Sequence, residues 1–244
     1  LGANTTAGSN TSIGAYSLSL NTTGGDNTAC GRSALQNNTT GATNTSVGYN
    51  SLQNNTTASN NVAVGYVALQ SNTTGTQNTA LGSGSLSANT TADENTAVGY
   101  LALNDNTTGA LNTAVGAYCL DVNTTGGSNV AVGANALGAN TTASNNTALG
   151  TRALQENTTG AQQTAVGMNA LKDNTTGGNN TAVGYQAMTD NTTGGLNAAI
   201  GREALFKNTE GNQNTACGVY TLYENLTGIE NTAVGYVALE KNTA

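Results

Sequence analysis

The stretch Asn95-Thr-Ala-Val-Gly-Tyr-Leu-Ala-Leu-Asn-Asp-Asn-Thr-Thr-Gly-Ala-Leu111 is one unit of a repeat that runs through the chain. Its glycine, Gly99, has a counterpart every 17 residues, fourteen in all, from Gly14 to Gly235, with no insertion or deletion. Self-similarity at a fixed period is typical of architectures in which each unit stacks on the next. The sequence therefore predicts a single repeat array over residues 1–244, without separate domains.

Some positions of the unit are constrained and others vary freely. The fourth residue before the glycine is Asn in 13 of 14 units, with Gln163 as the exception, and the residue directly before it is Val, Ile, Leu or Cys. The fourth residue after it is Leu in 13 units, with Met188 as the substitute, and the seventh is always Asn. A unit of this length with a glycine and an Asn-Thr-Thr turn cannot hold two helices. We therefore expect an all-β parallel β-roll, a β-solenoid of fourteen 17-residue coils.

Each coil is expected to hold one strand on the Asn-Thr-Ala-Val segment and a second on the Ala-Leu pair or the Asn-Thr-Thr that follows. At about 4.8 Å per coil, fourteen coils would form a rod roughly 65 to 70 Å long. Because strand side chains alternate, Thr96 and Val98 share one face and Asn95 and Ala97 the other. Val62, Val130 and Ala198 replace the Thr, which indicates that the Thr and Val face is the interior.

Three sets of residues follow from this assignment. The predicted core is Val98, Val115, Val132, Leu103, Leu120 and Leu137. A ladder of stacked, hydrogen-bonded side chains is predicted at Asn106, Asn123, Asn140, Asn157, Asn174 and Asn191. A candidate protomer interface is predicted at Ala97, Ala114, Ala131, Ala148, Ala165 and Ala182.

The interface prediction depends on two columns of small residues. Two before the glycine every residue is Ala or Ser, and three after it nine of fourteen are Ala. A solvent-facing position would admit Lys, Glu or Gln, so small side chains indicate a closely packed second surface, most simply an identical chain. Tight turns within the coil are the alternative explanation.

The motif Asn-Thr-Ala-Val-Gly-Tyr-x-Ala-Leu, at Asn95 to Leu103 and Asn231 to Leu239, resembles the head repeat of YadA-like trimeric autotransporter adhesins. It is also similar to the repeat shafts of phage-type tail-fibre proteins. The resemblance implies a left-handed β-roll packed side by side into a homotrimer or fibre, outside a cell or on a virion. The repeat here is longer than the adhesin repeat, and no neck, stalk or membrane anchor is seen. Both ends of the sequence fall inside a coil, which favours a segment of a longer fibre.

The composition argues against most other classes. Asn and Thr contribute 38 and 43 of 244 residues, charged residues are 8%, His is absent and the net charge is -7. We expect no enzyme, no catalytic residue, no metal site and no cofactor, since acids stand in variable columns without a repeated pair. Six basic residues cannot neutralise a row of phosphates, which excludes nucleic acid as a partner. No apolar run is long enough for a transmembrane helix, so this segment should not insert into a membrane.

Several repeated features have two interpretations each. Three cysteines, Cys30, Cys119 and Cys217, stand in columns that apolar or small residues otherwise fill. They are either buried substitutes for those residues or form disulfides between chains, because Cys30 and Cys217 are too far apart to bond within one rod. Asn-x-Thr triplets recur from Asn21 to Asn191 and at Asn225. They are either glycan acceptors or residues that form the turn of each coil and a hydrogen-bonded ladder between coils. The tyrosines after the glycine (Tyr49, Tyr66, Tyr100, Tyr185 and Tyr236) either stack on sugars or form the rim of a protomer contact.

The predicted function is that of an extracellular or cell-surface structural fibre, or adhesin head or shaft, for display and attachment. A cell-surface or matrix receptor would be bound through loop residues such as Asp105, Lys172 or Lys207. The alternatives are a phage tail-fibre shaft and an ice-binding solenoid that uses the Thr column from Thr22 to Thr243 and the column after it.

Overall fold

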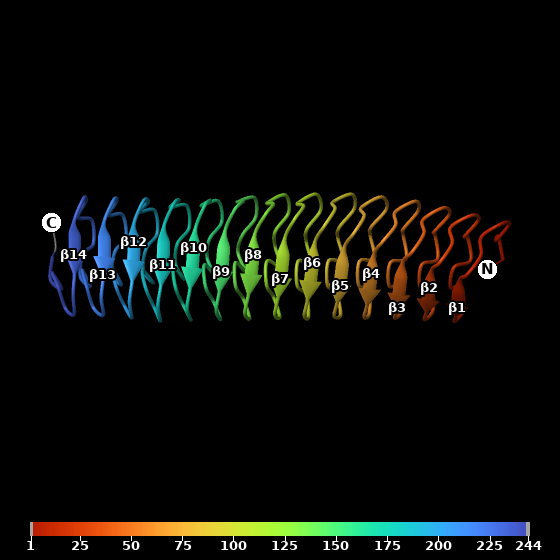
Figure 1. The fold of residues 1–244 in the computed structure, drawn as a ribbon, viewed down its shortest axis with the longest axis horizontal. Helices are drawn as coiled ribbons and strands as arrows, with labels where there is room; N and C mark the ends of the chain where they lie inside the picture. The colour runs from red at the N-terminus through yellow and green to blue at the C-terminus, as the bar shows by residue number, and fades with distance from the viewer. Residues whose placement is uncertain (1, 243–244) are drawn as a thin grey trace. The chain divides into compact units, whose positions relative to one another are not determined.

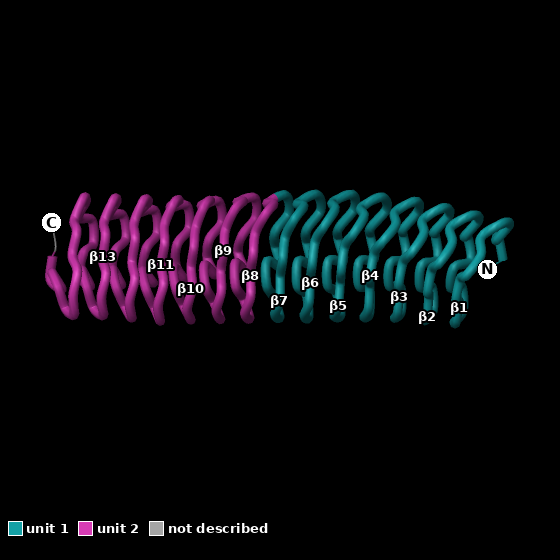
Figure 2. Tube along the Cα trace, in the orientation of Figure 1, with its two compact units in different colours: residues 1–125 teal, residues 126–244 magenta. Residues whose placement is uncertain are grey.

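The computed structural model describes residues 2–242, and the chain divides into two compact units, residues 1–125 and 126–244 (Figure 2). Both units are built from the same 17-residue coil, and each coil contributes one short strand. No helix is present among the described residues, so this part of the chain has no helix able to cross a membrane. The all-β parallel β-solenoid expected from the repeat is confirmed.

Each strand covers the three residues that precede the conserved glycine (Figure 1). In the first unit the strands are β1 (Thr11–Ile13), β2 (Thr28–Cys30), β3 (Thr45–Val47), β4 (Val62–Val64), β5 (Thr79–Leu81), β6 (Thr96–Val98) and β7 (Thr113–Val115). In the second unit they are β8 (Val130–Val132), β9 (Thr147–Leu149), β10 (Thr164–Val166), β11 (Thr181–Val183), β12 (Ala198–Ile200), β13 (Thr215–Cys217) and β14 (Thr232–Val234).

Within each unit the strands pair in parallel and in register, like residue on like residue. Ala97 of β6 lies opposite Ala80 of β5 and Ala114 of β7, and Ala165 of β10 lies opposite Ala182 of β11. The backbone outside the strands pairs with the next coil as well, since the amide of Leu103 donates to the carbonyl of Cys119 at 2.9 Å. Stacking of equal coils therefore satisfies backbone groups throughout the coil, including the turns.

The predicted second strand of each coil is wrong. The Ala-Leu pair lies in tight turns and the Asn-Thr-Thr segment is a bend, as at Ala102-Leu103 and Asn106–Thr108. The physical reason is the backbone conformation, because Leu103 adopts a φ of 52° and Leu101 a φ of 53°, in the left-handed region. That conformation costs an L-residue about 1–2 kcal/mol, and it closes a narrow coil that a strand could not.

The conserved glycine follows each strand because no other residue fits there. Gly99 has a φ of 137°, and an added Cβ would lie 2.5 Å from the carbonyl oxygen of Gly116 in the next coil. Both the dihedral and the close approach of two backbones exclude a side chain. The 17-residue glycine period is thus fixed by the stacking of one coil on another.

The interior lies on the face opposite to the one predicted. Ala97 has no exposed surface and Asn95 is buried, whereas Val98 is only half-buried and Val132 is 37% exposed. The predicted core residues Val98, Val115 and Val132 therefore lie on the outward face of the sheet. Leu103, Leu120 and Leu137 are fully buried, as predicted, and form the opposite wall of the interior.

The two columns of small residues meet each other inside the coil. Where Ser replaces Ala in the strand, its hydroxyl reaches the small residue of the turn, as in Ser12 to Ser17 at 2.9 Å and Ser46 to Ser51 at 2.8 Å. Small side chains are required because strand and turn approach closely across a thin core.

The interface prediction is therefore wrong for all six residues. Ala97, Ala114, Ala131, Ala148, Ala165 and Ala182 are completely buried within their own chain, where no other molecule can contact them. The constraint that was attributed to a neighbouring chain comes from tight packing within the coil, which was the alternative explanation.

Candidate interaction surfaces

One column of buried asparagines forms a continuous hydrogen-bonded ladder within each unit. Asn106 donates from Nδ2 to Oδ1 of Asn89 at 3.2 Å and to the carbonyl of Gly109 at 2.9 Å, and it accepts from Asn123 at 2.8 Å. In the second unit Asn174 and Asn191 repeat the geometry, with an Asn191 to Asn174 distance of 2.7 Å. The other predicted ladder positions are bonded in the same way, with Asn157 donating to Asn140 at 3.2 Å. These side chains hold the bend of each coil onto the next coil.

A second asparagine column, four residues before the glycine, fixes the start of each strand. Oδ1 of Asn44 accepts the backbone amide of Asn61 at 3.0 Å, and Nδ2 of Asn44 donates to the carbonyl of Ala58 at 2.9 Å. The near-invariance of this column was visible in the sequence, but its role was not assigned. The signal was available, because a buried Asn is tolerated only where both ends of the amide are bonded.

Gln163 is the single departure in that column. Its backbone amide still donates to Asn146 at 3.0 Å and its Nε2 donates to the carbonyl of Gly177, but its buried Oε1 has no hydrogen-bond partner. The extra methylene displaces the amide from the position that the Asn side chains occupy. The second ladder therefore carries an unsatisfied acceptor at this coil.

The threonines that follow the ladder asparagines do not form a free hydroxyl array. The hydroxyl of Thr107 donates to the carbonyl of Thr124 at 3.0 Å, and that of Thr175 to Thr192 at 3.0 Å. The next column, which includes Thr108, is exposed on the bend rather than on a strand. Thr243, the last residue of the predicted ice-binding column, lies outside the described residues. The geometry places this pair of columns at a corner of the coil.

The outward face of the sheet carries two columns of uncharged side chains. One column is Thr in most coils, with Val62, Val130 and Ala198 as replacements, and the other is Val, Ile, Leu or Cys. The second column is exposed to a degree unusual for apolar residues, with Val47 at 36% and Leu81 at 46%. No charged residue interrupts either column from β1 to β14. This outward face, defined by the first and third residue of each strand, is uncharged and partly exposed to solvent.

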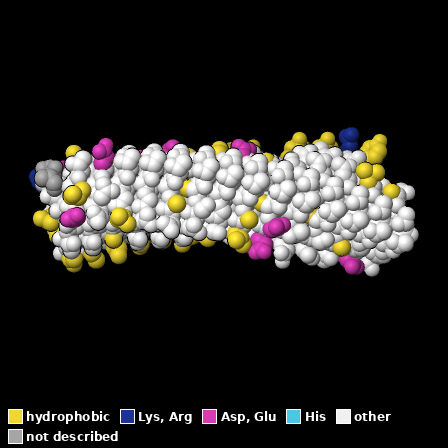
Figure 3. Space-filling model, turned by 90° about the horizontal axis from the view of Figure 1, so that it is seen from above, with side chains coloured by type: hydrophobic (Ala, Val, Ile, Leu, Met, Phe, Trp, Pro, Cys, Tyr) yellow, Lys and Arg dark blue, Asp and Glu magenta, His cyan; other side chains and the backbone are white. Residues whose placement is uncertain are grey.

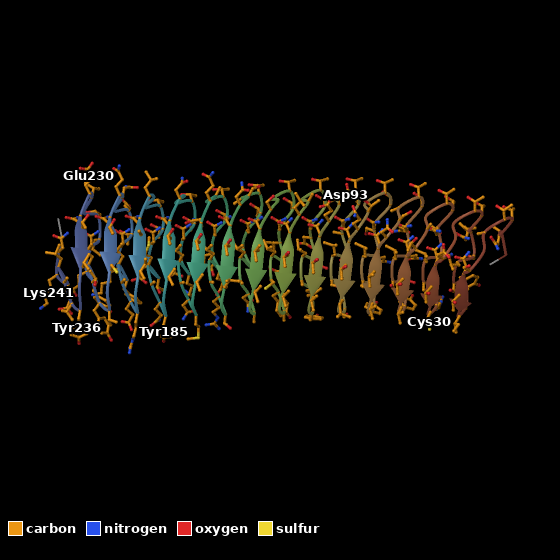
Figure 4. All side chains as sticks on the ribbon, in the orientation of Figure 1. Cys30, Asp93, Tyr185, Glu230, Tyr236 and Lys241 are labelled. Carbon is orange, nitrogen blue, oxygen red and sulfur yellow. The ribbon has the colours of Figure 1, made fainter. Side chains whose placement is uncertain are left out.

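The two borders of the outward face differ in chemistry. In the second unit, Tyr185 and Tyr236 lie at the edge where the strands end, and Glu230 lies at the opposite edge (Figure 4). In the first unit Asp93 lies at the edge from which the strands begin (Figure 4). Tyrosines of the first border stack between coils, with the rings of Tyr49 and Tyr66 5.5 Å apart. The face thus has an aromatic border on one side and a polar border on the other.

Aromatic and basic side chains form a cluster near the end of the second unit. The guanidinium of Arg202 lies 5.8 Å from the ring of Tyr185 and 5.5 Å from that of Tyr220, and its Nε bonds Glu203 at 3.0 Å. The hydrogen bond to Glu203 raises the pKa of Arg202.

Lys207, a predicted receptor-binding residue, is paired in the same cluster. Its Nζ lies 3.0 Å from Glu224 and 5.4 Å from the ring of Tyr223. Lys172, another predicted contact, pairs with Asp173 at 2.5 Å. These cations are matched by neighbours on their own surface, so they stabilise the turns rather than present unpaired charge to a ligand.

Acidic side chains are spread along the variable columns. Burial raises the pKa of Asp121, and the nearby carboxylate of Asp105 raises it further. Burial also raises the pKa of Asp190. Among residues 2–242 no three His, Cys, Asp or Glu side chains are grouped as metal ligands would be. Charged side chains are few and separated on the face that Figure 3 presents.

Burial decides between the two interpretations of the cysteines and of the Asn-x-Thr triplets. Cys119 is buried, as a substitute for a small residue, whereas Cys30 is half-buried and Cys217 is exposed, both on the outward face. Cys30 and Cys217 are free thiols. The triplet asparagines, such as Asn106 and Asn225, have no exposed surface and are bonded on both ends of the amide. A glycan cannot be attached to such a side chain while the coil is folded.

Comparison with known proteins gives no match to this chain, either among protein-family models, among curated proteins or among solved structures.

Proposed function

We propose that this chain is a structural segment of an extracellular fibre, a β-solenoid whose function is to hold and display neighbouring parts at a fixed distance. The observation that carries the proposal is that every coil has the same length and, with Gln163 as the one departure, the same two asparagine ladders, while charged residues occur only in the variable turn columns. A chain selected for a localised site would be expected to vary its coil length around that site.

The likeness of Asn95 to Leu103 to the heads of YadA-like adhesins supports a position on a cell surface or virion. Mechanical stiffness would come from hydrogen bonds that run from coil to coil through backbone, amide and hydroxyl groups. Adhesion to a receptor would then belong to the variable turn columns, where exposed side chains such as Asp105 lie.

Deletion of one whole coil tests the structural role. Removal of residues 95–111 joins two equivalent positions of the repeat, so the remaining coils should stack unchanged and keep their resistance to protease. Removal of residues 95–107 deletes nearly the same sequence but shifts the register, and it should produce an unstable, protease-sensitive protein. Equal damage from both deletions would show that this coil carries a specific role and would contradict the proposal.

The location is tested on the intact source particle or cell. Antibodies against the exposed turns should label the surface of the intact particle or cell before lysis. Labelling that appears only after lysis would contradict an extracellular fibre.

A further inference from the structure

We propose that the outward face of the sheet binds ice, through the hydroxyl and methyl groups that the first and third residue of each strand present to water. The ligand is a neutral lattice of water molecules that repeats in two dimensions. Ice binding would be a function in addition to the structural role proposed above, and neither depends on the other. It is assigned here to the strand threonines and not to the bend threonines of the predicted ice-binding columns.

The strand threonines have hydroxyl groups that the chain itself does not use. Thr is the first residue of eleven of the fourteen strands, and none of these side chains is buried. Within the described residues the hydroxyls of Thr96 and Thr113 have no hydrogen-bond partner, whereas that of Thr107 in the bend donates to the carbonyl of Thr124. A hydroxyl has one donor and two acceptor positions, so each strand Thr can bind water on its outward side.

These groups are ordered in two dimensions within each unit. The strands run side by side, parallel and in register, so that Thr96 lies beside Thr79 and Thr113 (Figure 1). Neighbouring strands are about 4.8 Å apart, and the two outward residues of one strand are about 6.6 Å apart. Both spacings are comparable with those at which oxygen atoms repeat on the faces of an ice crystal. The exposed bend column that contains Thr108 provides only a single line of hydroxyls at a corner of the coil.

The side chains of the outward face are rigid. Thr, Val or Ile occupies 23 of its 28 positions, and branching at Cβ restricts χ1, so the backbone fixes where each methyl and hydroxyl lies. Little conformational entropy is then lost when a crystal covers them. Strand propensity alone would also admit Tyr and Phe. Tyrosines such as Tyr100 stand after the glycine, but none occupies either outward column.

The outward face is also free of charge. No Asp, Glu, Lys or Arg occurs at any of the 28 positions, although the turns of the same coils carry side chains such as Asp105 and Lys172. A charged group orders water around itself in a way that an ice lattice does not accommodate. The replacements of Thr at Val62 and Val130 keep its branched shape, and that at Ala198 keeps a single methyl group. The variation that occurs is therefore the variation that a neutral, regular lattice tolerates.

Matched double variants test the proposal. Thr96→Lys with Thr113→Lys changes the outward face at β6 and β7, and Thr108→Lys with Thr125→Lys adds the same charge at exposed bend positions of the same two coils. Thr96→Tyr with Thr113→Tyr is a second outward-face variant, which keeps strand propensity and adds bulk without charge. Circular dichroism and urea unfolding establish which variants are folded. The shape of growing ice crystals and the gap between melting and freezing temperatures are then measured at equal protein concentration.

The expected result is that the native chain shapes ice crystals and opens a gap between melting and freezing, that the bend variant retains both effects, and that the folded outward-face variants lose them. A native chain that leaves ice crystals unaltered would overturn the proposal, and so would a folded outward-face variant with the full effect. Loss in the bend variant alone would assign ice to the bend and overturn the site proposed here. The coil-deletion experiment measures stacking and protease resistance, so it separates a failure of ice binding from a failure of the structural function.

Discussion

Truncation of one ladder asparagine tests whether side-chain hydrogen bonds hold the coils together. Asn106→Ala removes three of them, to Asn89, Gly109 and Asn123. A net hydrogen bond contributes about 1 kcal/mol, and a buried acceptor left without a donor costs about 1–3 kcal/mol more. Since Oδ1 of Asn89 loses its donor in a buried site, we expect a loss of about 3–5 kcal/mol in the free energy of unfolding.

Urea unfolding measures the loss, and hydrogen exchange of the amides in adjacent coils shows where it acts, because a solenoid transmits a defect mainly to its neighbours. Thr108→Ala in the same bend is the control, and it should change stability by less than about 0.5 kcal/mol because Thr108 is exposed. Asn106→Asp keeps the side-chain volume but removes the donors, so it should also destabilise strongly. A loss below about 1 kcal/mol for Asn106→Ala would refute the reasoning.

Four further outcomes are expected. Gly99→Ala should lower stability by about 3 kcal/mol or more in urea unfolding, because its φ of 137° excludes a side chain and the next backbone is too close. Gln163→Asn should raise the unfolding free energy by about 1 kcal/mol, since it replaces an unsatisfied buried acceptor by the bonded ladder residue. Ala97→Lys should abolish the β-sheet signal in circular dichroism rather than separate protomers, because Ala97 is in the core. Burial and Asp105 raise the pKa of Asp121, so its carboxyl favours folding when protonated, and this contribution is lost as pH rises from the ordinary value of 3.8 through the raised pKa. Asp121→Asn should therefore stabilise the protein at pH 7 and have no such effect at pH 3, in urea titrations at both pH values.

The coil and its stacking were predictable because the sequence repeats with a constant period of 17 residues. An invariant glycine every 17 residues and an Asn in every bend indicate one repeated backbone geometry, and the ladder from Asn106 to Asn191 follows from that. The second strand was not predictable in the same way. Leu at position 103 favours extended or helical backbone, and nothing in its side chain signals a φ of 52°. Closure of the coil imposes that conformation against the local preference.

The orientation of the strand was the decisive error. Alternation divides Thr96 and Val98 from Asn95 and Ala97, but it does not say which pair faces inward. Its apolar side chain favoured Val98 as the inward residue, whereas the interior is so thin that only Ala or Ser fits opposite the turn. Asn95 fits because its side-chain amide donates to Asn78 and Asp93 and accepts from the backbone of Asn112. The paired serines were the missed signal, since Ser12 occurs with Ser17 and Ser46 with Ser51 in the same coils.

Reversing the strand also reverses the argument about partners. A column restricted to small residues proved to be core, so the conserved column of larger apolar residues that includes Val98 is the one left in contact with water. Burial within a single chain explains why Ala97 never varies to a larger side chain, but it gives no reason for Val, Ile, Leu or Cys to recur on the outside in every coil.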